Sequence, residues 1–373
     1  MWISDEKPSA FLKSLTPWET VLEKSGLPVY LYGTGNGADK TMDYLLSRGL
    51  KVSGVFASDG FVRDRSFRGF RVLSQEDMER RCGKAAVILC FSLSGREGYE
   101  RLDRLAERHL VFAPSSTVCG TDFRSMAFLR SRADQLDRID GWLSDGLSRE
   151  LFRRVLRWKV TGDHRWLDGP EEEDRCPDAY YRHGRVHIDV GAYDGDTVRS
   201  YLAENPNVDR ILAFEPDADS FRKLQAGTDP SRVDCFLAAC GDRNGVLPFS
   251  GRRGRGSAVA ADGNGTVPVW TLDVICGHRR LGEPGKDVGS LKIDAEGMDA
   301  KVLYGAANLI TDCRPVVRAA AYHREEDLTE IPRILKRYVY RSNLYFRKKA
   351  CVPAWDAEYI LVPEPRSGER QET

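Results

Sequence analysis

The sequence predicts an α/β protein made of two units, each built on a mainly parallel sheet. Three observations lead to this fold class. Short, continuous apolar runs are typical of strands that are buried on both faces. These runs alternate along the chain with segments that have the features of helices, and such alternation indicates a parallel sheet. The alternation occurs twice, on either side of a helical stretch, and 373 residues are enough for two cores.

The first unit is expected to be a small Rossmann-like domain. After its third strand, Ser74 is expected to cap a helix, with Asp77 in the third position of a capping box. The loop Gly33-x-Gly35-x-x-Ala38 after the first strand fits the dinucleotide fingerprint, with alanine in third place. It predicts either a nucleotide site or a tight strand–helix turn, and both remain open. The predicted strands are residues 28–32, 52–56, 70–73, 85–91 and 110–112.

A helical connector is expected between the two units. Apolar residues recur every three or four positions from Leu136 to Val155, which is the helical period. We expect the helices of residues 123–160 to pack on the second domain, because their apolar stripe needs a surface to cover it. Residues 168–178, with three consecutive glutamates and two prolines, predict a surface loop. The expected domains are 1–120 (Rossmann-like), 121–180 (connector) and 181–363 (second α/β domain), followed by a frayed tail at 364–373.

The second domain opens with a strand that stops at a glycine-rich bend, residues 186–197. Gly191 and Gly195 allow backbone N–H groups to approach a ligand closely. A second strand, residues 211–214, ends at Glu215, where a carboxylate lies beside the bend and can accept both hydroxyls of a ribose. Asp189 in the bend would repel a pyrophosphate and favour a cation. S-adenosylmethionine, which has an ammonium, a sulfonium and a ribose, fits this chemistry, so a methyltransferase is the leading hypothesis.

Two later strands, residues 290–294 and 315–321, predict a transfer site. They end at Asp294, with Glu296 just beyond, and at His323. If the first of them lies between the bend strand and the second, then Gly191, Asp294 and His323 line one crevice. His323 beside a carboxylate is then either a general base for a substrate hydroxyl or a structural histidine. Magnesium held by Asp294 and Glu296 is an alternative, and we favour a metal-free route because no third carboxylate is evident.

Two further features leave their roles open. The third strand is expected at residues 233–239 and leads to Asp242, which is either a partner of an adenine amine or a turn aspartate. The loop 251–265 is rich in glycine and arginine. It either closes over an anionic substrate or is a solvated hairpin tip, and we favour the hairpin tip.

Four segments, residues 188–197, 214–217, 291–299 and 321–328, also carry a family resemblance. With them, the chain from about Trp142 to Pro363 resembles the FkbM family of S-adenosylmethionine-dependent methyltransferases. The resemblance implies a class I methyltransferase fold and transfer to hydroxyls of glycans or secondary metabolites, near Asp294, Glu296 and His323. The chain has Phe346-Arg347-Lys348-Lys349 where many members carry an Arg-His-Tyr run, which affects substrate choice. With Asp242 included, the candidate cofactor residues are Asp189, Gly191, Ala192, Tyr193, Gly195, Thr197, Glu215, Asp217 and Asp242.

The composition argues against a nucleic-acid-binding, membrane-spanning or disulfide-rich protein. Lysine and arginine total 56, as do aspartate and glutamate, so no net field favours nucleic acid or an anionic membrane. Nine cysteines without a Cys-x-x-Cys pair indicate buried thiols in a reducing compartment. No signal peptide is evident, and the longest apolar run, residues 85–91, is too short to span a bilayer, so we expect a cytoplasmic protein.

Two other functions are also compatible with the sequence. One is an NAD(P)- or nucleotide-sugar-dependent oxidoreductase or epimerase that uses the first domain. The other is a non-catalytic binding protein. The expected partner is a small-molecule or glycan acceptor, and the oligomeric state stays open.

Overall fold

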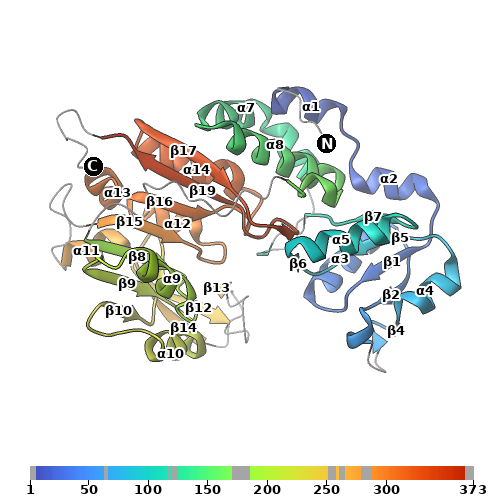
Figure 1. Ribbon diagram of the computed structural model, residues 1–373, viewed down its shortest axis with the longest axis horizontal. Helices are drawn as coiled ribbons and strands as arrows, with labels where there is room; N and C mark the ends of the chain where they lie inside the picture. Colours follow the sequence, from blue (N-terminus) through green and yellow to red (C-terminus); the bar gives the residue numbers. More distant parts are fainter. Residues whose placement is uncertain are drawn as a thin grey trace. The chain divides into compact units, whose positions relative to one another are not determined.

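The chain forms two compact units in the computed structural model (Figure 1). Unit 1 comprises Met1–Asp140, Arg149–Glu172 and Lys348–Asp356, and unit 2 comprises Gly141–Ser148, Glu173–Arg347 and Ala357–Thr373. No helix in the described part of the chain combines the length and the apolar character that a membrane crossing requires. The structure describes residues 6–62, 66–115, 118–119, 125–169, 185–250, 258–259, 265–278 and 288–365.

Unit 1 is built on a six-stranded sheet with the order β3-β4-β2-β1-β5-β7. All neighbouring pairs are parallel except β3 and β4, so the predicted parallel sheet is confirmed. The strand order reverses beside β1, because β2 and β5 lie on its two sides. The strands are β1 (Val29–Tyr32), β2 (Val52–Phe56), β3 (Ser66–Phe67), β4 (Phe70–Leu73), β5 (Ala86–Leu89) and β7 (Leu110–Phe112).

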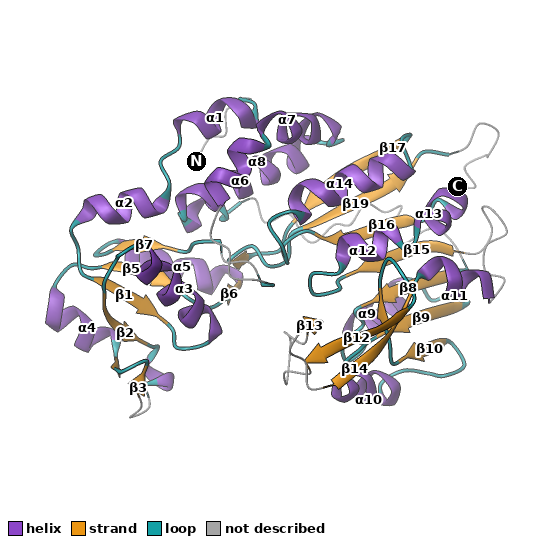
Figure 2. Ribbon diagram, turned by 180° about the vertical axis from the view of Figure 1, so that it is seen from behind, coloured by secondary structure: helices purple, strands orange, loops and turns teal. Residues whose placement is uncertain are grey.

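The helices of unit 1 follow the strands in alternation (Figure 2). In α3, Ala38, Met42 and Leu45 are buried and pack in the same core cluster as Leu31 of β1. Ser74 caps α4 as predicted, since its Oγ accepts the Asp77 N–H at 3.0 Å. The helices are α1 (Pro8–Ser14), α2 (Trp18–Ser25), α3 (Asn36–Ser47), α4 (Gln75–Cys82), α5 (Gly95–Ala106) and two 3₁₀ turns, η1 (Asp59–Phe61) and η2 (His164–Trp166).

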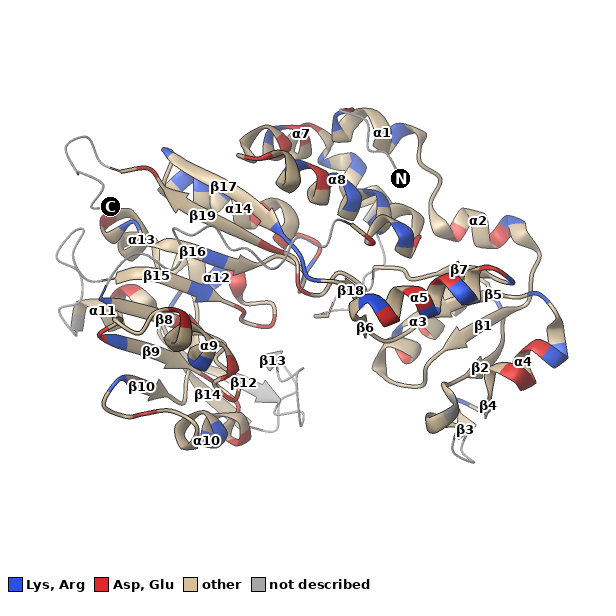
Figure 3. Ribbon diagram, in the orientation of Figure 1, with Lys and Arg blue, Asp and Glu red and all other residues tan. Residues whose placement is uncertain are grey.

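Basic and acidic residues are interspersed on the outer helices of unit 1 (Figure 3). On α4, Arg80 pairs with Asp77, and on α5, Arg96 pairs with Glu100. These pairs are exposed, and surface pairs of this kind add little stability. They spread the charge over α4 and α5 rather than concentrating one sign.

The connector helices were expected to pack on the second domain. Most of this segment belongs to unit 1 instead. Trp158 of α8 donates from Nε1 to the Ala113 carbonyl at 2.7 Å, and the Arg157 guanidinium lies 3.7 Å from the Phe11 ring centroid. The helical period predicted an apolar stripe but did not determine which surface would cover it. The helices are α6 (Ser125–Ser131), α7 (Ala133–Trp142) and α8 (Gly146–Thr161).

A short segment near the end of the chain also belongs to unit 1. Lys348–Asp356 contains β18 (Cys351–Val352), which pairs antiparallel with β6 (Leu93–Ser94). The Tyr99 hydroxyl of α5 donates to the Cys351 carbonyl at 3.2 Å and to the Leu167 carbonyl at 2.9 Å. Unit 1 is therefore assembled from three separate stretches of sequence, whereas the predicted boundary at residue 120 stays a prediction.

Unit 2 is built on a seven-stranded sheet with the order β10-β9-β8-β15-β16-β19-β17. The first five strands are parallel, and β19 runs antiparallel to both of its neighbours. β15 lies between β8 and β16, as the predicted crevice requires. The strands are β8 (Val186–Val190), β9 (Arg210–Phe214), β10 (Val233–Phe236), β15 (Val288–Ile293), β16 (Val316–Ala320), β17 (Ser342–Arg347) and β19 (Glu358–Pro363).

The third strand of unit 2 is shorter than predicted. β10 ends at Phe236, Leu237 is exposed, and Ala239–Cys240 forms β11 in a separate four-stranded sheet. The continuous apolar run hid this change of sheet, because periodicity alone does not mark where one strand ends and the next begins. The other strands of the small sheet are β12 (Gly245–Ser250), β13 (Ala258–Val259) and β14 (Gly265–Trp270). The predicted arginine loop lies largely outside the described residues, as does most of the acidic loop and of the tail.

Helices connect the parallel strands of unit 2 and bury its core. Val198 of α9 and Leu224 of α10 pack in one cluster with Ile211 and Ala213 of β9. The result is the α/β architecture that the sequence predicted, with the loops after β8, β9, β15 and β16 at one sheet edge. The helices are α9 (Asp196–Glu204), α10 (Ala218–Ala226), α11 (Leu272–His278), α12 (Asp299–Tyr304), α13 (Ala307–Cys313) and α14 (Asp327–Tyr338).

Candidate active site

The bend after β8 requires glycine for two physical reasons. Gly191 has φ +78°, in the left-handed region, and a Cβ at this position would collide with the carbonyl oxygen of Asp294. Gly195, with φ +88°, forms the N-cap of α9. Tyr193 between them also has a positive φ, of 49°. The bend therefore lies directly against the loop that follows β15.

Asp189 is fully buried at the end of β8. The Thr197 hydroxyl donates to its Oδ2 at 2.5 Å, and the Lys292 ammonium lies 3.1 Å from its Oδ1. Burial raises the pKa of the Asp189 carboxyl above its ordinary value, and Lys292 opposes this shift. Asp189 and Thr197, which are both predicted cofactor residues, therefore contact each other, and Asp189 is also paired with Lys292.

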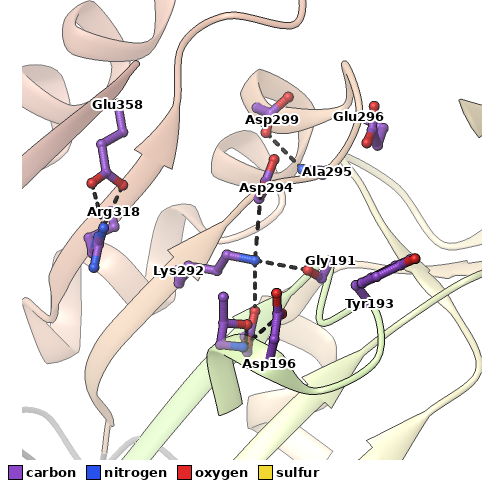
Figure 4. Close-up of polar contacts among 12 residues, drawn as sticks. Gly191, Tyr193, Asp196, Lys292, Asp294, Ala295, Glu296, Asp299, Arg318 and Glu358 are labelled. Carbon is purple, nitrogen blue, oxygen red and sulfur yellow. Dashed lines mark hydrogen bonds and ion pairs between the residues drawn. The ribbon is translucent and has the colours of Figure 1, made fainter. Parts of the chain in front are cut away.

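Lys292 is a central residue of this edge to which the sequence reasoning gave no role. Its ammonium donates to the Gly191 carbonyl at 2.8 Å and lies 4.0 Å from Asp294 Oδ2 (Figure 4). Burial acts to lower the pKa of Lys292, but the charges of Asp189 and Asp294 raise it overall, so the side chain stays charged. A lysine within an otherwise apolar strand was the signal that could have identified it.

Glu215 lies at the end of β9 with its carboxylate held by backbone groups. The Tyr193 N–H donates to Oε2 and the Asp217 N–H donates to Oε1, both at 2.8 Å. Burial raises the pKa of Glu215 to about 7. A carboxylate has about four lone-pair sites, so it can accept further hydrogen bonds beyond these two.

The remaining predicted cofactor residues have other local roles. Ala192 is buried in the core, with its N–H bonded to the Phe214 carbonyl at 3.0 Å. Asp217 caps α10, accepting the N–H groups of Asp219 and Ser220. Asp242 is exposed and follows β11 rather than β10, so the structure does not bring it to the expected strand end.

The predicted transfer residues lie together in a group that we call the histidine cluster, composed of Asp294, Glu296, Asp299 and His323. His323 is fully buried after β16, and its Nδ1 lies 2.8 Å from Asp299 Oδ2. Its Nε2 lies 3.3 Å from Asp294 Oδ1 and 3.8 Å from Glu296 Oε2. The structure therefore unites the three residues that the sequence singled out and adds Asp299.

The charge on His323 bears on its predicted role as a base. Burial acts to lower the pKa of His323, but Asp299, with Asp294 and Glu296, raises it overall to about 10. The imidazole is therefore protonated at neutral pH in the ligand-free protein, and an imidazolium cannot accept a proton. The expected partner was Asp294, whereas Asp299 is the nearer carboxylate.

Comparison with known proteins identifies the second unit. Residues 189–342 match the model of the methyltransferase FkbM domain. Unit 2 contains an FkbM methyltransferase domain. The chain is 25% identical over 151 residues to 2-O-methyltransferase NoeI of Sinorhizobium fredii (strain NBRC 101917 / NGR234), a match that spans 35% of this chain and 60% of that protein.

A solved structure extends the likeness to the whole chain. The methyltransferase FkbM from Methylobacillus flagellatus KT matches with a TM-score of 0.69 and 16% identity. The match covers 95% of this chain and 97% of that chain. At this identity the likeness shows a shared fold rather than a shared activity.

Asp299 organises the loop of the FkbM domain that follows β15. Its Oδ1 accepts the Ala295 N–H at 2.9 Å, and its Oδ2 accepts the Gly297 N–H at 3.1 Å. The Tyr322 hydroxyl donates to Asp294 Oδ1 at 3.1 Å. Asp299 lies in the first turn of α12, so an acidic helix start directly after a strand was the available signal.

A cavity of about 460 Å³ lies beside the bend of the FkbM domain. Tyr193 and Asp217, which hold Glu215 through their N–H groups, are among the residues that line it. Arg222 and Lys223 of α10 line it as well. The cavity therefore lies between the bend after β8 and α10.

Proposed function

We propose that the protein transfers a methyl group from S-adenosylmethionine to a hydroxyl of a sugar, glycan or secondary metabolite. The observation that carries the proposal is the Glu215 carboxylate, fixed by two N–H groups beside the bend after β8. A carboxylate at this strand end accepts ribose hydroxyls in nucleotide-binding α/β proteins. The match of residues 189–342 to the FkbM domain supports the same reaction class.

The residues of the bend fit this cofactor. Glu215 would accept the ribose hydroxyls, and the backbone around Gly191 and Gly195 allows close approach. The Asp189 carboxylate adds negative charge for a cationic ligand, although the Lys292 ammonium, 3.1 Å from Oδ1, offsets part of it. When bound, the cofactor would supply an electrophilic methyl group on a sulfonium. The protein would then have to orient the acceptor and remove one proton.

The histidine cluster is the proposed place for the acceptor hydroxyl. The side chains of Asp294 and Glu296 are 39% and 31% exposed, so a ligand can reach them, whereas His323 is fully buried. Positioning and a proton acceptor are the main needs of transfer to an alcohol. The relative from Sinorhizobium fredii is named a 2-O-methyltransferase, which supports oxygen as the acceptor atom.

Calorimetric titration with S-adenosylmethionine tests the cofactor assignment. Glu215→Ala should weaken binding by about 1–3 kcal/mol, since the ribose hydroxyls lose a charged acceptor. Glu204→Ala, at an exposed carboxylate in α9 of the same unit, is the matched control and should bind as the wild type does. Equal affinity of the wild type and Glu215→Ala for S-adenosylmethionine would show that Glu215 does not bind the cofactor.

The reaction itself is tested by mass measurement on candidate glycans after incubation with a labelled methyl donor. Thermal stability in the presence of S-adenosylmethionine, NAD(P) or nucleotide sugars compares the alternatives, because a ligand that binds only the native state raises its stability. A shift with NAD(P) or nucleotide sugars and none with S-adenosylmethionine would favour the oxidoreductase or epimerase alternative. A cytoplasmic location and the absence of a nucleic-acid partner stay predictions.

A further inference from the structure

The hydrogen bonds of Asp299 determine which nitrogen of His323 is available to a ligand. Asp299 accepts the N–H groups of Ala295 and Gly297, so its carboxylate acts as an acceptor at this site. The contact with His323 Nδ1 at 2.8 Å therefore has the imidazole donating from Nδ1. This fixes the ring orientation and directs Nε2 toward Asp294 and Glu296. A carboxylate that orients a histidine in this way is typical of metal centres.

Nε2 of His323 is a buried polar atom that makes no hydrogen bond within the described residues. The histidine side chain is fully buried. Within the described residues, Asp294, Asp299 and His323 also form a group whose ligand atoms lie within 4.8 Å of one another. A buried nitrogen that faces two carboxylates is a stronger indication of a ligand than the acidic residues alone.

The spacing of these atoms suits a small divalent cation. Nε2 lies 3.3 Å from Asp294 Oδ1 and 3.8 Å from Glu296 Oε2. Metal–ligand distances of about 2.0–2.2 Å place neighbouring ligand atoms about 3.0–3.5 Å apart. The distance between Nε2 and Asp294 Oδ1 fits this spacing, and the Glu296 side chain would have to move inward to complete the site. One imidazole nitrogen with carboxylate oxygens favours manganese or zinc over calcium, which prefers an all-oxygen shell.

We propose that His323 Nε2, Asp294 and Glu296 bind a divalent cation of the manganese type, with Asp299 orienting the histidine. The cation would take the place of the Nε2 proton, which leaves to solvent when the metal binds. This replaces our metal-free preference, because the third ligand is a nitrogen rather than the carboxylate sought in the sequence. The partial exposure of Asp294 and Glu296 leaves an open side to the cation. We assign the acceptor hydroxyl to that open side, where the cation would hold it in place. This assignment rests on the proposed function.

Manganese binding to the full-length protein tests the site directly. The protein is dialysed against EDTA, transferred to metal-free buffer and titrated with Mn²⁺, without cofactor or acceptor, while paramagnetic resonance reports the free ion. One bound ion per chain is expected. Asp294→Asn and Glu296→Gln should each weaken binding by about 10-fold or more, because each removes a charged ligand. Glu204→Gln, an exposed carboxylate outside the cluster, should bind Mn²⁺ as the wild type does.

Two results would overturn the inference. One is no binding at about 1 mM Mn²⁺, near the weak end of biological divalent-cation sites. The other is binding that Asp294→Asn and Glu296→Gln leave unchanged, provided that thermal unfolding shows both variants folded. Titration of the EDTA-treated protein with S-adenosylmethionine separates this inference from the proposed function. Cofactor binding without manganese binding would retain the methyltransferase assignment and remove only the metal site.

Discussion

The two parallel sheets of this chain carry different chemistry at equivalent edges. In unit 1, the end of β1 is aromatic: Tyr32 stacks on Phe56, with ring centroids 4.6 Å apart, and meets Phe91 edge-on at 4.8 Å. In unit 2, the end of β8 carries Asp189, which is buried beside the charged Lys292. In both units the strand order reverses beside this strand, where α/β proteins commonly bind ligands, but only the side chains decide what reaction such an edge supports.

The glycine loops differ in the same way. In unit 1 the close approach is made by Gly37, where a Cβ would collide with the Cys90 carbonyl oxygen, so the glycine serves helix–strand packing. Gly35, by contrast, has open space around the position of a Cβ. In unit 2 the close approach is at Gly191, between the bend and the loop that carries Asp294. A nucleotide role for the loop of unit 1 stays a prediction.

Substituting one glycine in each unit should give the largest contrast. Gly191→Ala combines a collision with the Asp294 carbonyl and a left-handed φ, so it should destabilise unit 2 by about 3 kcal/mol or more. Gly35→Ala has φ −97° and open space, so it should change stability by less than about 0.5 kcal/mol. Thermal unfolding measures both variants. A stable Gly191→Ala protein would show that the bend can relax away from the loop after β15.

Gly35→Ala also tests the open role of unit 1. If backbone at Gly35 contacts a nucleotide, this substitution should abolish any nucleotide-induced rise in melting temperature while leaving the unliganded stability unchanged. A nucleotide effect that is equal in wild type and variant would show that Gly35 is not part of a nucleotide site.

The next largest effect is expected on the rate of methyl transfer when His323 is replaced. His323→Ala should lower the rate of methyl transfer by about 100-fold or more while leaving cofactor affinity nearly unchanged. The physical reason is that His323 holds Asp294 and Glu296 at the transfer edge, at distances of 3.3 and 3.8 Å. Single-turnover transfer and cofactor titration measure the two quantities once an acceptor is known. Parallel loss of rate and cofactor binding, or full activity, would assign His323 a structural role.

A pH dependence follows from Glu215. Its pKa in the folded protein is about 7, above the ordinary value of 4.5, so the folded state retains a proton between these values that the unfolded state has lost. This group's contribution to stability therefore falls as pH rises from about 4.5 to about 7. Ribose hydroxyls favour the charged carboxylate, so cofactor affinity should rise up to about 10-fold per pH unit in this window and level off above it.

Glu215→Gln is the control for this pH effect, because a neutral amide cannot titrate. Calorimetric titrations between about pH 5 and pH 8 should give a nearly flat affinity profile for the variant. A wild-type profile that is equally flat would show that Glu215 does not ionise on cofactor binding.

The sequence predicted those parts of the molecule that depend on local patterns. The strand runs, the Ser74 cap and the meeting of Asp294 and Glu296 with His323 all follow from periodicity and from parallel topology. The change of sheet after Phe236 was missed because the apolar run continues without a turn signal. The role of Asp299 was missed because its contact with His323 joins the start of α12 to the loop after β16, two segments that lie 24 residues apart in the sequence.

The smallest effects test whether the two units unfold separately. Trp158→Phe removes the hydrogen bond to the Ala113 carbonyl in unit 1, and Tyr201→Phe removes the contact between its hydroxyl and Ser290 Oγ in unit 2. Both groups are buried, and each lost hydrogen bond should cost about 1 kcal/mol in its own unit. Trp158→Phe should cost more than Tyr201→Phe, because it also removes buried ring atoms.

Calorimetry should then show two transitions, with each variant lowering only one of them, by about 2–4 °C for Tyr201→Phe and by more for Trp158→Phe. The effect of Trp158→Phe also tests whether the connector helix α8 belongs to unit 1. Because α8 bonds to Ala113, the change should appear in the transition of unit 1, although the sequence placed this helix with the second domain. If either variant shifted both transitions equally, the two sheets would be one cooperative body. The two sheets would then differ in the side chains at their edges but would not unfold independently.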